Sequence, residues 1–175
     1  MAYTPIIGTL AYLWDRDDDT VLMIHRNARA DDEHLGKYNG LGGKLEQDES
    51  IICGLRREIH EEAGLELTSI SLRGTISWPG FGPQGEDWLG FIFLVDGWVG
   101  TAPDCNDEGD LSWVQRHRLI EATSTNEEVR RNANLPMWEG DRHFLPLVFD
   151  DDPRAFHGVM PYHGGYPNHW SYERL

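Results

Sequence analysis

The stretch that decides the fold runs from Gly43 to Leu65 and reads GKLEQDESIICGLRREIHEEAGL. Within it, apolar side chains recur at three- and four-residue spacing, which is typical of a helix with one buried face; they are Ile52, Leu55, Ile59 and Ala63. Ser50 is a favourable N-cap, and Gly64 suits the left-handed position that ends a helix. The stretch therefore predicts an amphipathic helix from Ser50 to Ala63.

Three glutamates of this predicted helix carry its chemistry. Glu58 and Glu62 are one turn apart, so their carboxylates lie on one side of the helix, with Glu61 next to them. Like charges at this spacing destabilise a helix by a few tenths of a kcal/mol. A hard divalent cation, which prefers oxygen ligands, would offset that repulsion. Taken alone, the three glutamates are better explained as a solvated acidic face.

The spacing around the glutamates resembles the Nudix box, G-x5-E-x7-R-E-U-x-E-E-x-G-U, where U is aliphatic. All its fixed positions are filled in this chain, by Gly43, Glu49, Arg57, Glu58, Ile59, Glu61, Glu62, Gly64 and Leu65. The resemblance implies an α/β (α+β) fold, in which a mixed β-sheet is sandwiched between helices. It also implies hydrolysis of a nucleoside diphosphate linked to another group.

The length of 175 residues corresponds to one domain, so we expect a single domain over residues 1–175 with an aromatic tail at about 161–175. No apolar run is long enough to span a membrane, and the N-terminus has no basic region typical of a signal peptide. The two cysteines form no CxxC motif, which favours a reduced, cytoplasmic protein. The oligomeric state is open.

The net charge of −15 argues against electrostatic binding of nucleic-acid polymers or anionic membranes. The same charge opposes a phosphorylated small molecule unless metal ions bridge protein carboxylates to phosphate oxygens. Acidity that serves only solubility is the simpler alternative.

Hydrophobic patterns predict the remaining elements. Strands are expected at Pro5–Trp14, Thr20–Arg26, Leu67–Trp78, Trp88–Trp98 and Leu111–Val114, partial helix at Arg118–Asn134, and a strand pair at Phe144–Phe149 and Ala155–Met160. The glycines of the segment from Lys37 to Leu45 would permit close approach of the backbone to a ligand or ion.

The Nudix resemblance assigns roles position by position. Glu58 and Glu62 would be the principal ligands of Mg²⁺ or Mn²⁺, Glu61 a third carboxylate, and the carbonyl of Gly42 or Gly43 a further oxygen ligand. All three glutamates would thus be catalytic residues.

Four other residues receive expected roles. Glu49 and Arg57 would form a structural ion pair, and Lys44 either contacts a phosphate or is simply an exposed lysine. Glu108 lies in the acidic loop from Thr101 to Asp110 and would be a metal ligand or general base, with a solvated loop glutamate as the alternative.

Further resemblance is to the MutT-like oxidised-purine nucleoside triphosphatases, in the segments YNGLGGK (38–44) and LPMWEGD (135–141). It implies that Asn39, Trp138 and Asp141 hold a purine base. A tryptophan offers a stacking face, and the two polar side chains offer directional hydrogen bonds. Gly140 departs from the pattern, because these relatives have an aspartate there. An aspartate introduced at this position is therefore expected to raise the preference for 8-oxo-dGTP.

The sequence predicts a metal-dependent hydrolase that converts a (deoxy)nucleoside triphosphate, such as 8-oxo-dGTP, to the monophosphate and pyrophosphate. Alternatives are hydrolysis of ADP-ribose or a dinucleoside polyphosphate, a non-catalytic nucleotide sensor, and an RNA pyrophosphohydrolase. The intact glutamates disfavour the sensor, and the negative charge disfavours the RNA substrate.

Overall fold

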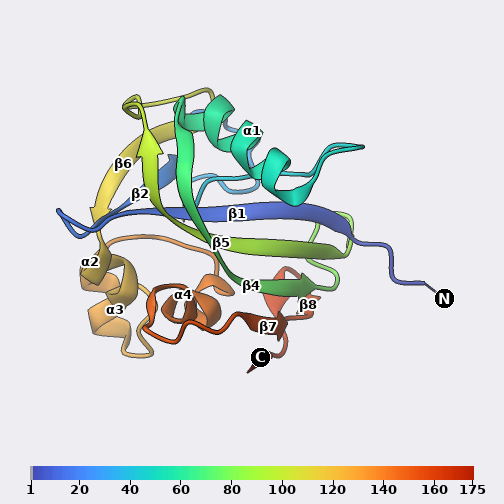
Figure 1. Ribbon diagram of the computed structural model, residues 1–175. Coiled ribbons are helices and arrows are strands. Elements are labelled where there is room, and N and C mark those ends of the chain that lie inside the picture. Colours follow the sequence, from blue (N-terminus) through green and yellow to red (C-terminus); the bar gives the residue numbers. More distant parts are fainter. Residues whose placement is uncertain (1) are drawn as a thin grey trace.

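The computed structural model describes residues 2–175 as a mixed β-sheet with helices on both faces (Figure 1). The sheet has the strand order β10-β7-β4-β5-β1-β2-β3, with β6 also paired to β2. Its strands are β1 (Ile6–Asp15), β2 (Thr20–Arg26), β3 (Tyr38–Asn39), β4 (Glu66–Trp78), β5 (Trp88–Val99), β6 (Gly109–Gln115), β7 (Phe156–Val159) and β10 (Ser171–Arg174). The pairs β1–β5 and β4–β7 are parallel, and the others are antiparallel. The expected fold class is confirmed.

The central strands β1 and β2 diverge, and the chain from Lys37 to Leu45 fills the gap between them. The two strands pair only next to their turn, where Leu13 to Asp15 of β1 face Leu22 to Thr20 of β2. Beyond that point, Leu41 exchanges two backbone hydrogen bonds with Ala11, at 2.7 and 3.0 Å. We call residues 37–45 the wedge segment. It lies at the junction of both faces of the sheet and leads directly into the helix of the Nudix-like stretch.

Each face of the sheet buries its own apolar core, because strand side chains alternate between faces. Helix α1 (Ile51–Ala63) covers one face, and α2 (Arg116–Glu121), α3 (Glu127–Ala133) and α4 (Asp141–Phe149) cover the other (Figure 1). In β1, Ala11 and Leu13 join the core under α1, whereas Tyr12 joins the core under α4.

The helix expected from the sequence is confirmed with both ends. The hydroxyl of Ser50 accepts a hydrogen bond from the backbone N–H of Cys53 at 3.2 Å, and Gly64 has a left-handed φ of 65°. Leu55, Ile59 and Ala63 are fully buried, as the stripe predicts, but the prediction is wrong for Ile52, which is 37% exposed near the start of the helix.

The predicted strand pair at Phe144–Phe149 and Ala155–Met160 is wrong in its first member, which belongs to α4. Four of its residues are buried at helical spacing, namely Phe144, Leu145, Val148 and Phe149. A six-residue apolar run fits a buried strand or one face of a helix equally well, so packing against the sheet determines the outcome. The predicted helical region Arg118–Asn134 is divided between α2 and α3.

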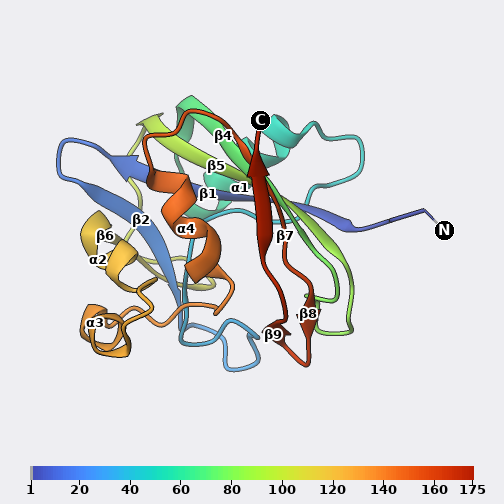
Figure 2. The ribbon, with the colours of Figure 1, turned by 90° about the horizontal axis from the view of Figure 1, so that it is seen from below.

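The C-terminal tail is an integral part of the sheet. Strands β8 (Tyr162–His163) and β9 (Tyr166–Pro167) form a hairpin, and β10 then pairs antiparallel with β7 at the sheet edge (Figure 2). The tail therefore lies on the same side of the molecule as α4. Within residues 2–175, no helix has the length and hydropathy needed to cross a membrane.

Candidate active site

Two glycines of the wedge segment bring the backbone against the glutamates of α1. A β-carbon at Gly43 would lie 2.5 Å from the carboxyl group of Glu58, so only glycine allows that carboxylate its place. Gly42 has a φ of 139°, a conformation that favours glycine, and its N–H donates to Glu62 Oε2 at 2.8 Å. The glycines predicted to permit close approach therefore do so toward the helix.

The carboxylates are crowded, and their pKa values reflect it. Burial, followed by the charges of Glu108 and Glu58, raises the pKa of Glu62 to about 8, although the hydrogen bond from Gly42 opposes this. Burial likewise raises the pKa of Glu58. Glu61, by contrast, is exposed. Two half-buried carboxylates in a like-charged environment are unfavourable unless a cation or protons neutralise them.

The donors fit a hard divalent cation, since carboxylate and backbone carbonyl oxygens are what such ions prefer. Of the two glycine carbonyls, that of Gly43 accepts a hydrogen bond from Thr9 N–H at 2.9 Å. Among residues 2–175, no three His, Cys, Asp or Glu side chains are gathered into a ready-made cation cage. The glutamates would therefore have to draw together around an ion.

Arg57 links the loop before α1 to the glutamates on it. Its guanidinium donates to both carboxylate oxygens of Glu49, at 2.7 and 2.9 Å, and to the backbone carbonyl of Lys44 at 3.1 Å. It also donates to Glu58 at 2.9 Å and Glu61 at 3.3 Å. The hydrogen bond from Arg57 lowers the pKa of Glu49 to about 2. This is the geometry of the structural ion pair that the sequence predicts, and it also orients Glu58.

Glu108 faces the same carboxylates from the far side. Its charge acts on both Glu58 and Glu62, and its carboxylate forms an ion pair with Arg26 of β2. The loop that carries it is tied to α1, because Asn106 Nδ2 donates to the carbonyl of Glu62 at 3.1 Å. Arg26 is a residue that no motif in the sequence indicates.

At the opposite end of the wedge segment, Trp138 lies in a cluster of polar and aromatic side chains. Its indole N–H donates to His34 Nδ1 at 2.8 Å, and Lys37 Nζ lies 4.3 Å from its ring centroid. Phe81 contacts the same ring edge-to-face at 5.9 Å between centroids. A base that stacks on Trp138 would have to share the ring with the ammonium group of Lys37 or displace it. His34 lies in the charged loop before β3, and Lys37 lies at the end of that loop. No motif in the sequence indicates that either residue contacts Trp138.

Asp141 is the first residue of α4 and lies close to this cluster. Burial raises the pKa of its carboxyl group to about 7, and the charge of Lys37 opposes that shift. The carboxyl group also faces the buried phenols of Tyr12 and Tyr162. Asn39 is half-buried in β3, opposite Ile24 of β2. No motif in the sequence indicates Tyr162, which lies in the tail.

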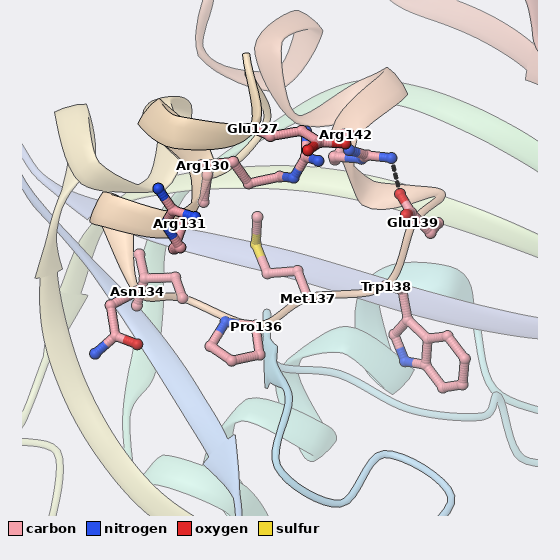
Figure 3. A pocket seen from close by; sticks show the side chains of 11 residues that line it. Glu127, Arg130, Arg131, Asn134, Pro136, Met137, Trp138, Glu139 and Arg142 are labelled. Carbon is pink, nitrogen blue, oxygen red and sulfur yellow. Dashed lines mark ion pairs between the residues drawn. The ribbon is translucent and has the colours of Figure 1, made fainter. Parts of the chain in front are cut away.

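A cavity of about 480 Å³ lies beside Trp138, between α3 and α4 (Figure 3). Neither Asn39 nor Asp141 lines it, and the indole is directed away from the side chains of Glu127 and Arg130. An ion pair between Glu139 and Arg142 crosses its rim (Figure 3). Of the three residues predicted to hold the base, only Trp138 therefore lines the cavity.

Lys44 pairs with Gly8 of β1 through an isolated bridge, and its side chain is exposed. Its ammonium lies 5.4 Å from the ring centroid of Trp88. The side chain thus stands between the glutamates and the aromatic residues, and its contact with a phosphate stays a prediction.

A mixed sheet between helices, with a glycine-rich loop delivering a glutamate-bearing helix, defines a class of metal-assisted hydrolases acting on phosphoanhydrides. The chain belongs to the Nudix family, because the family model described as NUDIX domain matches residues 4–146. It is a Nudix hydrolase, and this family generally uses divalent metals and acts on small nucleotide substrates.

Relatives and a solved structure support this placement. The chain is 28% identical over 149 residues to the uncharacterised Nudix hydrolase YvcI of Bacillus subtilis, covering 83% of this chain and 80% of that protein. It is 31% identical over 114 residues to the mouse (Mus musculus) oxidized purine nucleoside triphosphate hydrolase, covering 65% of this chain and 63% of that enzyme. A crystal structure of a mutator MutT protein from Bacillus halodurans superposes with a TM-score of 0.75 at 24% identity, covering 96% and 97% of the chains.

Proposed function

We propose that this protein hydrolyses a purine (deoxy)nucleoside triphosphate, with an oxidised purine such as 8-oxo-dGTP as the leading candidate, to the monophosphate and pyrophosphate. The observation that carries the proposal is the placement of two groups at the ends of the wedge segment. The glutamates of α1 lie at one end, and Trp138 and Asp141 lie at the other. A nucleotide laid along the segment would place its phosphates at the first group and its base at the second.

In the proposed reaction, a water oxygen attacks the α-phosphorus. The bond from that phosphorus to the bridging oxygen breaks, and pyrophosphate leaves with the electron pair of this bond. The proton of the water passes to a carboxylate, for which Glu108 is a candidate because it faces Glu58 and Glu62. Bound Mg²⁺ or Mn²⁺ would neutralise the charge that develops on the phosphates. Glu58, Glu61 and Glu62, with the carbonyl of Gly42 or Gly43, would hold the ion.

Two observations favour a purine over other groups. Trp138 provides an aromatic face and Asp141 a hydrogen-bonding carboxyl group. Asn39 lies in β3, whose Tyr38 N–H donates to the carbonyl of Pro136 in the segment that carries Trp138. The mouse relative is named for oxidised purine triphosphates. A cytoplasmic location is part of the proposal, since both cysteines are unpaired and exposed.

The test is a turnover screen of purine and pyrimidine triphosphates, ADP-ribose and a dinucleoside polyphosphate, with separated products as the readout. Glu62→Gln should keep the melting temperature but lower turnover by orders of magnitude, and excess chelator should abolish wild-type turnover. Glu66→Gln, an exposed glutamate at the start of β4, is the matched control. Hydrolysis that survives chelator would exclude the metal assignment. Preferred turnover of ADP-ribose would replace the proposed substrate.

A further inference from the structure

Gly140, which stands where similar enzymes have an aspartate, has no room for a side chain. Gly140 is buried before α4, and a β-carbon there would collide with the hydroxyl of Tyr162. The same β-carbon would lie 2.8 Å from Met160 Sδ. Both obstructing residues lie beyond residues 4–146, the part of the chain that the family model matches. An aspartate introduced at position 140 therefore fits only if the side chains of Tyr162 and Met160 move.

Tyr162 is fixed in place by its backbone and by its ring. Its N–H donates to the carbonyl of Pro79 at 2.8 Å, and its ring meets Phe81 edge-to-face at 4.9 Å between centroids. The residue is only 8% exposed. Phe81 in turn contacts Trp138, so the phenol belongs to the wall of the same aromatic cluster.

The hydroxyl of Tyr162 is directed toward the beginning of α4. It lies beside Gly140, where it would collide with an added β-carbon, and it is close enough to the carboxyl group of Asp141 for that charge to act on it. Burial and Asp141 together raise the pKa of Tyr162, so the phenol keeps its proton. A neutral hydroxyl can donate one hydrogen bond and accept others.

We infer that Tyr162 is a specificity-determining residue, whose hydroxyl supplies, beside Asp141, a polar contact to the purine. The inference rests on the proposed function. A hydroxyl both donates and accepts, whereas an ionised carboxylate only accepts, so Tyr162 offers the base a hydrogen-bonding pattern that a carboxylate does not. A segment of the C-terminal tail thereby takes part in the site.

The first experiment compares wild type with Tyr162→Phe, which keeps the ring and removes only the hydroxyl. Equilibrium binding of purine and pyrimidine nucleoside monophosphates, followed by tryptophan fluorescence in the presence of chelator, reads the base site without turnover. Loss of one partner of a buried hydrogen bond should weaken purine binding roughly tenfold to hundredfold. Pyrimidine binding and the melting temperature should change little. Tyr166→Phe, an exposed tyrosine of the same tail, is the matched control.

A second experiment tests the placement of the hydroxyl itself. Gly140→Ala should lower the melting temperature markedly in wild type but less in Tyr162→Phe, because the colliding oxygen is gone and only the contact with Met160 Sδ remains. kcat/KM for purine and pyrimidine triphosphates is measured in wild type, Gly140→Ala, Tyr162→Phe and the double variant. The ratio of purine to pyrimidine kcat/KM should be lower in the two proteins that lack the hydroxyl.

The outcomes separate the two proposals. If wild type binds purine nucleotides and Tyr162→Phe binds them with unchanged affinity and ranking, the assignment of Tyr162 is overturned while the proposed function stands. If wild type neither binds nor hydrolyses any purine nucleotide, the proposed function fails and this assignment falls with it. Additive effects of Gly140→Ala and Tyr162→Phe would likewise contradict the placement.

Discussion

Outside the glutamates of α1, Asp141 is the residue whose ionisation the structure changes most clearly. Its pKa is raised from 3.8 to about 7 by burial, and the facing groups are the ammonium of Lys37 and the phenols of Tyr12 and Tyr162. In the folded protein the carboxyl group is therefore protonated below about pH 7, whereas in the unfolded chain it ionises near pH 4.

Between these two pH values the folded state holds a proton that the unfolded state has lost, so rising pH lowers the free energy of unfolding. Asp141→Asn removes this dependence. We expect the variant to lose less stability than wild type between pH 5 and pH 8, measured by urea denaturation at both pH values. Asp31→Asn, an exposed aspartate, is the control. Parallel losses in wild type and Asp141→Asn would show that this carboxyl group titrates normally.

Trp138 and Asp141 should affect nucleotide binding in different ways. Trp138→Ala removes the stacking face, which is worth roughly 1–3 kcal/mol per base, and should weaken binding of every purine nucleotide alike. Asp141→Asn changes only the hydrogen-bonding pattern and should alter the ranking among purine triphosphates. The measurement is kcat/KM for dGTP, 8-oxo-dGTP and dATP. Unchanged ratios and affinities in both variants would place the base elsewhere.

At the scale of elements, the position of α1 against the wedge segment depends on Arg57. This single side chain joins Glu49, the carbonyl of Lys44 and the glutamates of the helix. Because charged hydrogen bonds contribute more than neutral ones, its loss should loosen the loop as well as the carboxylates.

Arg57→Ala is expected to lower the stability by roughly 1–3 kcal/mol, seen as a lower melting temperature, and to weaken cation binding. Arg56→Ala, an exposed arginine at the neighbouring position of the helix, should leave both quantities almost unchanged. A variant with normal stability and normal cation affinity, but with collapsed turnover, would assign Arg57 a direct chemical role instead.

For the whole molecule, the charge of −15 makes stability sensitive to ions. Added NaCl should raise the melting temperature by screening repulsion. MgCl₂ at the same ionic strength should raise it further, because an ion that binds only the folded protein at about a hundred times its Kd adds about 2.7 kcal/mol. For a chain of this size, that corresponds to roughly 5–10 °C.

The additional rise in melting temperature that MgCl₂ causes beyond NaCl should disappear in Glu62→Gln, whereas the rise caused by NaCl should remain. Calorimetry of both proteins in both salts measures this without any substrate. An equal excess in wild type and variant would show that the ion binds away from the predicted glutamates.

The sequence by itself determined the position of helix α1 and the family to which the chain belongs. Ser50, Gly64 and the apolar stripe act through local geometry, which neighbouring residues along the chain specify. The glutamates lie one turn apart for the same reason. Such features are readable because the interacting residues are close in sequence.

Only the tertiary structure decided which distant residues meet. His34 and Lys37 reach Trp138 across about a hundred positions of sequence, and Tyr162 fills the space beside Gly140. The same holds for α4, whose short apolar run became helical through packing against the sheet. These contacts depend on chain topology and on the volume available between elements. Periodicity and spacing within one segment carry no information about either.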